Sequence, residues 1–181
     1  GFTPLLSALE NGNPENFAIY MAGVNLLDKG LKQQLLVGKN KDGFTPLHEA
    51  LINGNPENFK IYMGAVNALD KGIRQQLLVG ANKAGFTPLH EAFINGNPKN
   101  FEIYMGAVNS FDEGVKEKLL AGVNNAGFTP LLSALKNGNP ENFTIYMGAV
   151  SAFNDEIKQQ LLTGANKAGF TPLHQALKNG S

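Results

Sequence analysis

The apolar positions of the chain recur at helical spacing between regularly placed Pro and Gly residues. An apolar face at Leu47, Ala50 and Leu51 follows a Thr-Pro pair and precedes Gly54. A Thr-Pro pair is typical of a helix start, because the hydroxyl can accept from an unpaired N–H and proline at the first helical position has no N–H to lose. Glycine after the last apolar residue is typical of a left-handed helix end. The pattern predicts a short helix over 46–53, closed by Gly54 in the left-handed conformation.

Two further helix signals follow in the same stretch. Asn55 and Pro56 repeat the start signal, with an amide as the cap. The apolar residues after them keep helical spacing: Phe59, Tyr62, Met63, Val66 and Leu69. Asp70 has the side chain of a third cap, and a further apolar period runs from it to Gly80. The unit therefore has three helices if the chain restarts at Asp70, or two if the second helix bends and continues.

The string Gly-Phe-Thr-Pro-Leu marks a tandem repeat of this unit. It begins every 42 residues, at Gly1, Gly43, Gly85, Gly127 and Gly169. The predicted organisation is a single array over 1–181, with full copies at 1–42, 43–84, 85–126 and 127–168 and a partial copy at 169–181. The second and third copies differ at only 13 of 42 positions, which indicates recent duplication or deliberate design.

The predicted fold class is all-α, a solenoid of stacked helical repeats with two or three helices each. No stretch has a strand-like alternation long enough to build a substantial sheet. A unit of this size cannot bury its apolar face alone, so neighbouring copies must cover it.

Positions that never vary between full copies predict the core of the stack, because a residue that faces a neighbouring copy meets the same surroundings each time. These are Phe17, Phe59, Phe101, Phe143 and the Ile-Tyr-Met triplets that begin at Ile19, Ile61, Ile103 and Ile145. The row of tyrosines lacks interleaved Arg or Lys, which favours core packing over base stacking.

Variable positions on the first helix of each copy predict a binding surface. They occupy three slots at offsets i, i+1 and i+4, and stacking about 8 to 10 Å apart aligns them into a stripe along the array. The stripe comprises Leu6, Ser7 and Glu10, then His48, Glu49 and Ile52, then His90, Glu91 and Ile94, then Leu132, Ser133 and Lys136, and finally His174, Gln175 and Lys178. The alternative is that these positions drift neutrally and that the two isoleucines pack against the next helix.

Charge and composition exclude several classes of partner. The chain has 15 Lys+Arg and 15 Asp+Glu without a basic block, so we expect no nucleic-acid partner and no membrane partner. It has no run of about 18 apolar residues and no charged-then-apolar leader. With no Cys it has no disulfide and no thiolate nucleophile. This composition is of the intracellular type, and the localisation itself stays unknown.

No residues with the spacing of a catalytic, cofactor or metal site stand out. His48, His90 and His174 occupy one slot in separate copies, too far apart to share an ion through bonds of about 2.0 Å. A histidine that hydrogen-bonds near its own helix start explains them. No phosphate-binding loop, nucleophile elbow or calcium loop occurs. We therefore expect a protein that is not an enzyme and needs no cofactor.

The helix-opening motif resembles that of ankyrin repeats. Thr-Pro-Leu-His-Glu-Ala at 45–50 and 87–92, and Thr-Pro-Leu-His-Gln-Ala at 171–176, carry the resemblance. Ankyrin units typically have about 33 residues and two helices, whereas this unit has 42 residues, and Leu6 and Leu132 replace the histidine in two copies. The resemblance implies an ankyrin-like array with an inserted helical turn or third helix, whose inner surface binds protein partners. The period also fits armadillo and HEAT units of about 40 to 47 residues, so a generic three-helix solenoid is the alternative.

Two functions follow as hypotheses. The first is a non-enzymatic repeat scaffold that presents a protein–protein interaction surface along its inner helices to a partner of unknown identity. The alternative is an engineered or excised structural repeat array with no evolved ligand, which the similarity of the copies favours.

The two ends of the array predict self-association. Solenoids normally close with copies whose outer face is polar. Here Phe2, Leu5, Phe17 and Met21 match the interior copies, and the last copy carries Phe170, Leu173 and Leu177. Both ends are therefore expected to expose apolar surface, which would allow end-to-end contact between molecules.

Overall fold

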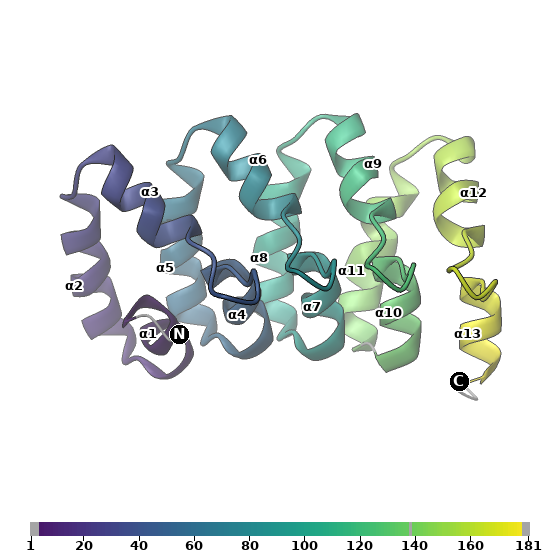
Figure 1. Ribbon diagram of the computed structural model, residues 1–181, viewed down its shortest axis with the longest axis horizontal. Coiled ribbons are helices and arrows are strands. Elements are labelled where there is room, and N and C mark those ends of the chain that lie inside the picture. Colours follow the sequence, from purple (N-terminus) through teal and green to yellow (C-terminus); the bar gives the residue numbers. More distant parts are fainter. Residues whose placement is uncertain (1–3, 138, 179–181) are drawn as a thin grey trace.

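The computed structural model describes residues 4–137 and 139–178, which form thirteen helices and no strand (Figure 1). The helices recur as a first, second and third helix in each copy. The first helices are α1 (Pro4–Asn11), α4 (Pro46–Asn53), α7 (Pro88–Asn95), α10 (Pro130–Asn137) and α13 (Pro172–Lys178). The second helices are α2 (Pro14–Asn25), α5 (Pro56–Asn67), α8 (Pro98–Asn109) and α11 (Pro140–Ser151). The third helices are α3 (Lys29–Val37), α6 (Lys71–Val79), α9 (Glu113–Ala121) and α12 (Asp155–Thr163).

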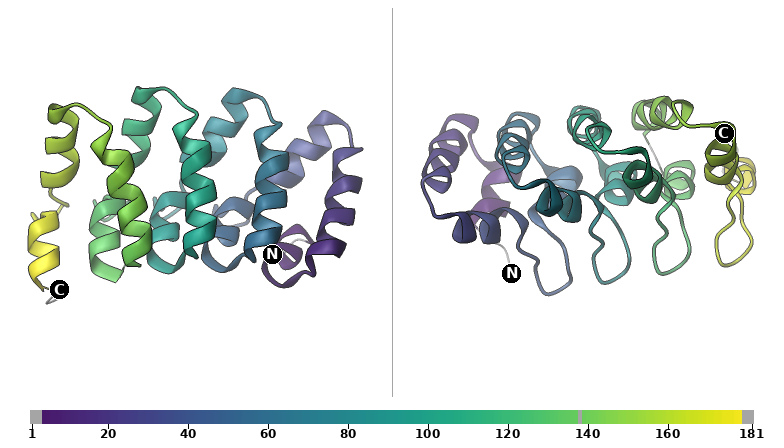
Figure 2. Two further views of the ribbon diagram at one scale, coloured as in Figure 1. Left: turned by 180° about the vertical axis from the view of Figure 1, so that it is seen from behind. Right: turned by 90° about the horizontal axis from the view of Figure 1, so that it is seen from above.

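Helices of the same class lie side by side along the long axis of the molecule (Figures 1 and 2). Each first helix packs against the first helix of the next copy, and each second helix does the same. The predicted all-α solenoid is confirmed, with three helices in each full copy, so the chain restarts after Asp70.

The core runs through the stack and is continuous between copies. Phe93 lies 5.0 Å from Phe101 of its own copy and 5.2 Å from Tyr146 of the next, measured between ring centroids. The isoleucine of the invariant triplet was wrongly assigned to the core in the first copy, where Ile19 is 72% exposed. The equivalent Ile145 lines a cavity beside Met105 of the preceding copy, so this slot faces backwards along the stack. Among the described residues, no copy lies on that side of Ile19.

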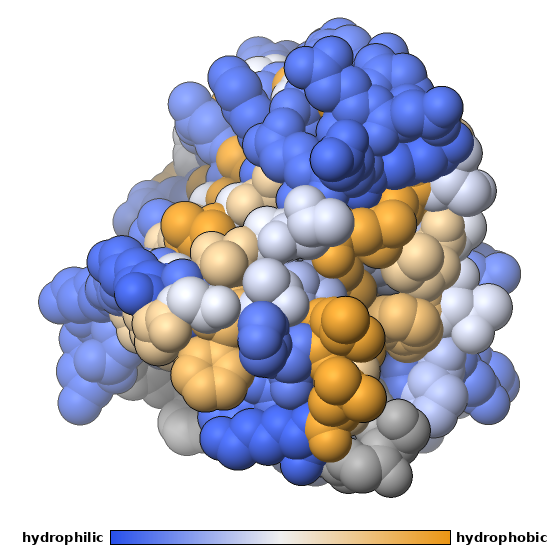
Figure 3. Space-filling model, turned by 90° about the vertical axis from the view of Figure 1, so that its right-hand side faces the viewer, coloured by the Kyte–Doolittle hydropathy of each residue, from blue (hydrophilic) through white to orange (hydrophobic). Residues whose placement is uncertain are grey.

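The apolar ends of the array lie partly where the pattern predicted. Leu173 and Leu177 of α13 are 67% and 72% exposed. Figure 3 shows the end of the molecule at which α13 lies, and hydrophobic residues are exposed on it. At the other end the predicted residues are wrong: Leu5, Phe17 and Met21 are buried within their own copy, and Phe2 lies outside the described residues. The exposed apolar side chains there are instead Ile19, Leu26, Leu27, Leu31 and Leu35, on and around α2 and α3.

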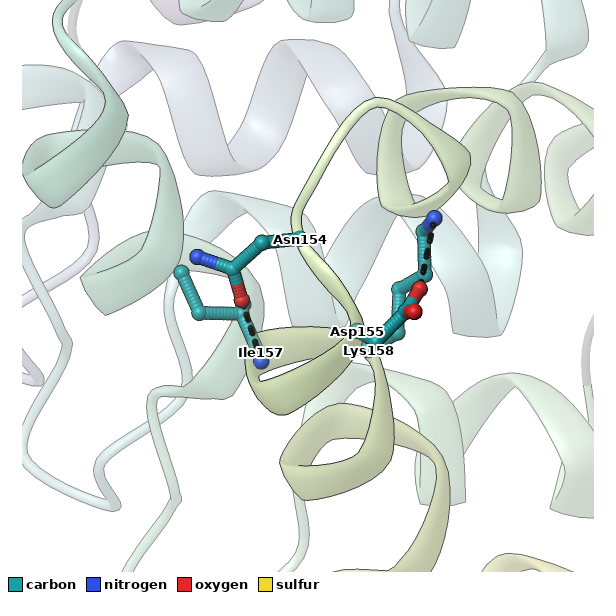
Figure 4. Close-up of polar contacts among 4 residues, drawn as sticks. All are labelled: Asn154, Asp155, Ile157 and Lys158. Atoms are coloured by element: carbon teal, nitrogen blue, oxygen red, sulfur yellow. Dashed lines mark hydrogen bonds and ion pairs between the residues drawn. The ribbon is translucent and has the colours of Figure 1, made fainter.

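Side-chain caps start the helices, as the pattern predicted. The Asn55 Oδ1 accepts from the N–H of Glu57 at 2.9 Å. In α12 the Asn154 Oδ1 accepts from the N–H of Ile157 at 3.0 Å, beside the Asp155–Lys158 ion pair (Figure 4). Asp70 is an exception, because it makes no cap bond and pairs instead with Lys29 of the preceding copy at 2.7 Å.

The described glycines that close first helices, Gly12, Gly54 and Gly96, are not left-handed, which corrects the prediction. Gly54 has φ −68° and ψ 137°, and the chain passes directly into the next cap at Asn55. A Cβ on Gly54 would lie 2.3 Å from the carbonyl oxygen of Ala50, so glycine is required there by close approach of the backbone. The left-handed glycines are Gly43, Gly85, Gly127 and Gly169, which end the loops between copies.

Candidate functional site

The first slot of the predicted stripe is buried and joins neighbouring copies. The Nδ1 of His48 accepts from the N–H of Thr45 at 3.2 Å, and its Nε2 lies 3.1 Å from the carbonyl oxygen of Phe86 in the next copy. Because a carbonyl oxygen only accepts, Nε2 carries the proton. Burial lowers the pKa of His48 to about 4, so the ring is neutral. His90 repeats this arrangement with the Phe128 carbonyl oxygen at 2.9 Å.

This burial corrects the prediction for most of the first slot. His48, His90 and Leu132 are fully buried, and Leu6 is 8% exposed, so these side chains do not face a partner. In α13, His174 is exposed and stays 2.7 Å from the Thr171 hydroxyl. The accessible part of the stripe therefore consists of His174 and those members of the second and third slots that are exposed or half-buried.

The second slot carries carboxylates on adjacent helices. Glu91 of α7 is 8% exposed, and burial followed by the charge of Glu49 raises its pKa to about 7. Burial and then the charge of Glu10 raise the pKa of Glu49 in α4. The acids thus lie close enough to repel one another. The slot also contains Ser7, which is exposed, and Ser133 and Gln175, which are buried.

The third slot changes character along the molecule. Glu10 is half-buried, and Ile52 and Ile94 are half-buried, which leaves part of each isoleucine on the surface. Lys136 and Lys178 are exposed, and their Nζ atoms lie 5.8 Å and 5.5 Å from the ring centroids of Phe128 and Phe170. The third slot therefore runs from acidic through apolar to basic.

A groove of about 400 Å³ opens between α7 and α10 on this surface. The stripe contributes Ile94, Ser133 and Lys136 to its lining, and the loops contribute Phe86 and Phe128. This is the place where predicted stripe residues from two copies come together around an apolar hollow.

The loops that join consecutive copies project together from one side of the solenoid and border the stripe (Figure 2). Backbone bonds tie the first three loops together: Lys83 N–H donates to Asp42 O at 3.0 Å, and Asn125 N–H donates to Ala84 O at 3.1 Å. The Lys167 Nζ of the fourth loop donates to Asn125 O at 2.8 Å. Within a loop, the Asn82 Oδ1 accepts from the N–H groups of Ala84 and Phe86. The groove is therefore bordered by ordered backbone.

The interpretation of the sequence missed two polar residues that hold the copies together. The Asn100 Nδ2 donates to the carbonyl oxygens of Ala50 and Gly54 in the preceding copy, at 3.1 and 2.7 Å. The Tyr104 hydroxyl donates to Leu78 O at 2.8 Å, also in the preceding copy. Asn58, Asn142, Tyr62 and Tyr146 repeat these bonds. The signal that could have found the asparagine is its presence in every full copy, directly before the invariant phenylalanine.

Within residues 4–137 and 139–178, no three His, Asp or Glu side chains are grouped to hold a metal ion. In the same residues, every helix is too short or too polar to cross a membrane.

Comparison with known protein families gives a match, which lies mostly within the second copy. The family model described as ankyrin repeat matches residues 42–71, which contain α4 and α5. No curated protein matches the chain.

Proposed function

Because the chain is an ankyrin-repeat protein, we propose that it is a non-enzymatic scaffold that binds a protein partner along the accessible stripe. Ankyrin repeats are generally protein-interaction scaffolds and are typically non-enzymatic. The observation that carries the proposal is the groove between α7 and α10, where Ile94, Phe86 and Phe128 line an apolar hollow beside polar residues that include the exposed Lys136. A partly exposed apolar hollow with a polar rim is typical of a protein-binding site.

The proposed surface comprises His174 and the exposed or half-buried members of the second and third slots: Ser7, Glu10, Glu49, Ile52, Ile94, Lys136 and Lys178. Glu91, Ser133 and Gln175 belong to the same slots and are buried. The half-exposed Ile52 and Ile94 would supply the apolar contacts. The buried first slot supports the surface from below, because its histidines fix the loops that border the groove.

Selection of peptides from a random displayed library on the full chain tests this proposal. We expect recovered peptides to bind the wild-type protein and to lose about tenfold in affinity with Ile94→Asp. Lys60→Asp changes an exposed residue on α5, away from the stripe, and serves as the matched control. If no peptide depends on Ile94, the proposal is wrong, and the structural array without an evolved ligand becomes the better account.

We propose, as a second candidate, that molecules associate end to end. The exposed Leu173 and Leu177 of α13 would meet the exposed Leu31 and Leu35 of α3 in another copy of the chain. Sedimentation velocity over a concentration series tests this: we expect growing species for the wild-type protein and a monomer for Leu173→Glu with Leu177→Glu. A wild-type protein that stays monomeric at the highest concentration contradicts it.

A further inference from the structure

We infer that the stripe selects an extended segment whose charge changes sign along its length, with basic side chains over α4 and α7, an apolar side chain between α7 and α10, and acidic side chains over α10 and α13. This inference rests on the proposed function and names the chemistry of the partner. Three separate features of the stripe carry it.

The first feature is a row of neighbouring carboxylates on the first helices, at Glu10, Glu49 and Glu91. Glu91 is 8% exposed, and among the described residues no hydrogen bond or ion pair reaches its carboxylate. After burial, the charge of Glu49 raises the pKa of Glu91, and the charge of Glu10 raises the pKa of Glu49. A cation supplied by a bound segment would relieve the repulsion between these carboxylates and stabilise this half of the stripe.

The second feature is the opposite charge on the other half. Lys136 and Lys178 occupy the slot that holds Glu10 in the first copy, and both are exposed on α10 and α13. Opposite charges at the two ends would orient a partner as well as attract it.

The third feature is the groove, which separates the two charged halves. Its apolar lining comes from Ile94, Phe86 and Phe128, and Lys136 lies on its rim. Neighbouring first helices lie about 8 to 10 Å apart. An extended segment advances about 3.3 Å per residue, so roughly three of its residues span the distance from one first helix to the next. We therefore expect the bound segment to carry two basic residues about three positions apart. An acidic residue should follow about three positions after the second basic residue, with an apolar residue between those two.

The charge order of selected peptides tests the inference. The library selection is repeated on the wild-type chain, on Lys136→Glu and on Glu91→Gln, each checked for unchanged helicity by circular dichroism. Lys136 is exposed, so its substitution leaves the core intact even if Glu91→Gln disturbs folding. Peptides that depend on Ile94 are then compared with composition-matched peptides in which basic and acidic residues are interleaved.

We expect polarised peptides to bind the wild-type chain about tenfold more tightly than the interleaved ones, and to lose that advantage on Lys136→Glu. Peptides that depend on Ile94 but show no charge order overturn the inference and leave the proposed function standing. The absence of any Ile94-dependent peptide overturns both.

Discussion

The asparagine that joins consecutive copies offers a matched test of how the array is held together. Asn100 is fully buried and donates to Ala50 O and Gly54 O of the preceding copy. Asn16 occupies the same slot in the first copy, where it is exposed and the described residues include no preceding copy. The two substitutions Asn100→Ala and Asn16→Ala therefore differ only in the contact between copies.

The size of the effect follows from the partners of each carbonyl group. Asn100→Ala removes two hydrogen bonds, each contributing about 1 kcal/mol. Ala50 O keeps the N–H of Gly54 as a donor at 2.9 Å, whereas the buried Gly54 O loses the Asn100 amide, at a cost of about 1 to 3 kcal/mol. The Asn100 Oδ1 is itself buried without a partner, and its removal offsets part of this cost. We expect a net loss of about 2 to 3 kcal/mol in the free energy of unfolding.

Urea unfolding followed by circular dichroism at 222 nm measures this loss. Asn16→Ala should change the free energy of unfolding by less than about 0.5 kcal/mol, as substitutions on an exposed surface usually do. Equal losses for the two variants, or a loss below about 0.5 kcal/mol for Asn100→Ala, would refute the assignment of this asparagine to the contact between copies.

Three further predictions use the same repetition or the perturbed carboxyl group. Tyr104→Phe removes the bond to Leu78 O and should cost about 1 kcal/mol in urea unfolding, whereas Tyr20→Phe, in the first copy, should cost close to nothing. Gly54→Ala places a Cβ 2.3 Å from a backbone oxygen and should lower the melting temperature, whereas Gly64→Ala meets nothing within 4 Å in a helix interior and should raise it. The pKa of the Glu91 carboxyl is raised from 4.5 to about 7, so the folded state binds this proton more tightly than the unfolded state does. The contribution of Glu91 to the free energy of unfolding therefore falls by at most about 3 kcal/mol as the pH rises from 4.5 to about 7. His48, with its pKa lowered to about 4, changes stability in the opposite direction below pH 6.5. The measurement is therefore the difference in the free energy of unfolding between Glu91→Gln and the wild-type protein. This difference should grow from pH 4.5 to 7.5 and would stay flat if Glu91 were solvated.

The elements predicted from the sequence are those fixed by local chemistry. Proline at the first helical position and a capping amide act within a few residues, so the helix starts at Pro46 and Pro56 could be predicted from the pattern. The third helix could be predicted from Asp70 as one of two alternatives, although Asp70 itself does not cap it.

The contacts between copies could not be predicted in the same way, because they depend on how separate helices cross. Nothing near His48 in the sequence indicates that its Nε2 bonds to Phe86 O, 38 residues away. The histidine was therefore assigned to the binding surface although it is a buried contact between copies. Ile19 was wrongly assigned to the core for a related reason: an invariant residue that faces the preceding copy is buried only where such a copy is present. The second and third slots of the stripe remain a prediction for binding.

The central claim is that stability resides in the contacts between copies rather than within one copy, and the most direct measurement is the unfolding of the second repeat by itself. A peptide of residues 43–84 keeps α4, α5 and α6 but loses the partners of Asn58, Tyr62 and His48 in the neighbouring copies. We expect its circular dichroism to show little helix and no cooperative urea transition, beside a sharp transition for the full chain. A cooperative transition of the peptide at the midpoint of the full chain would contradict the claim.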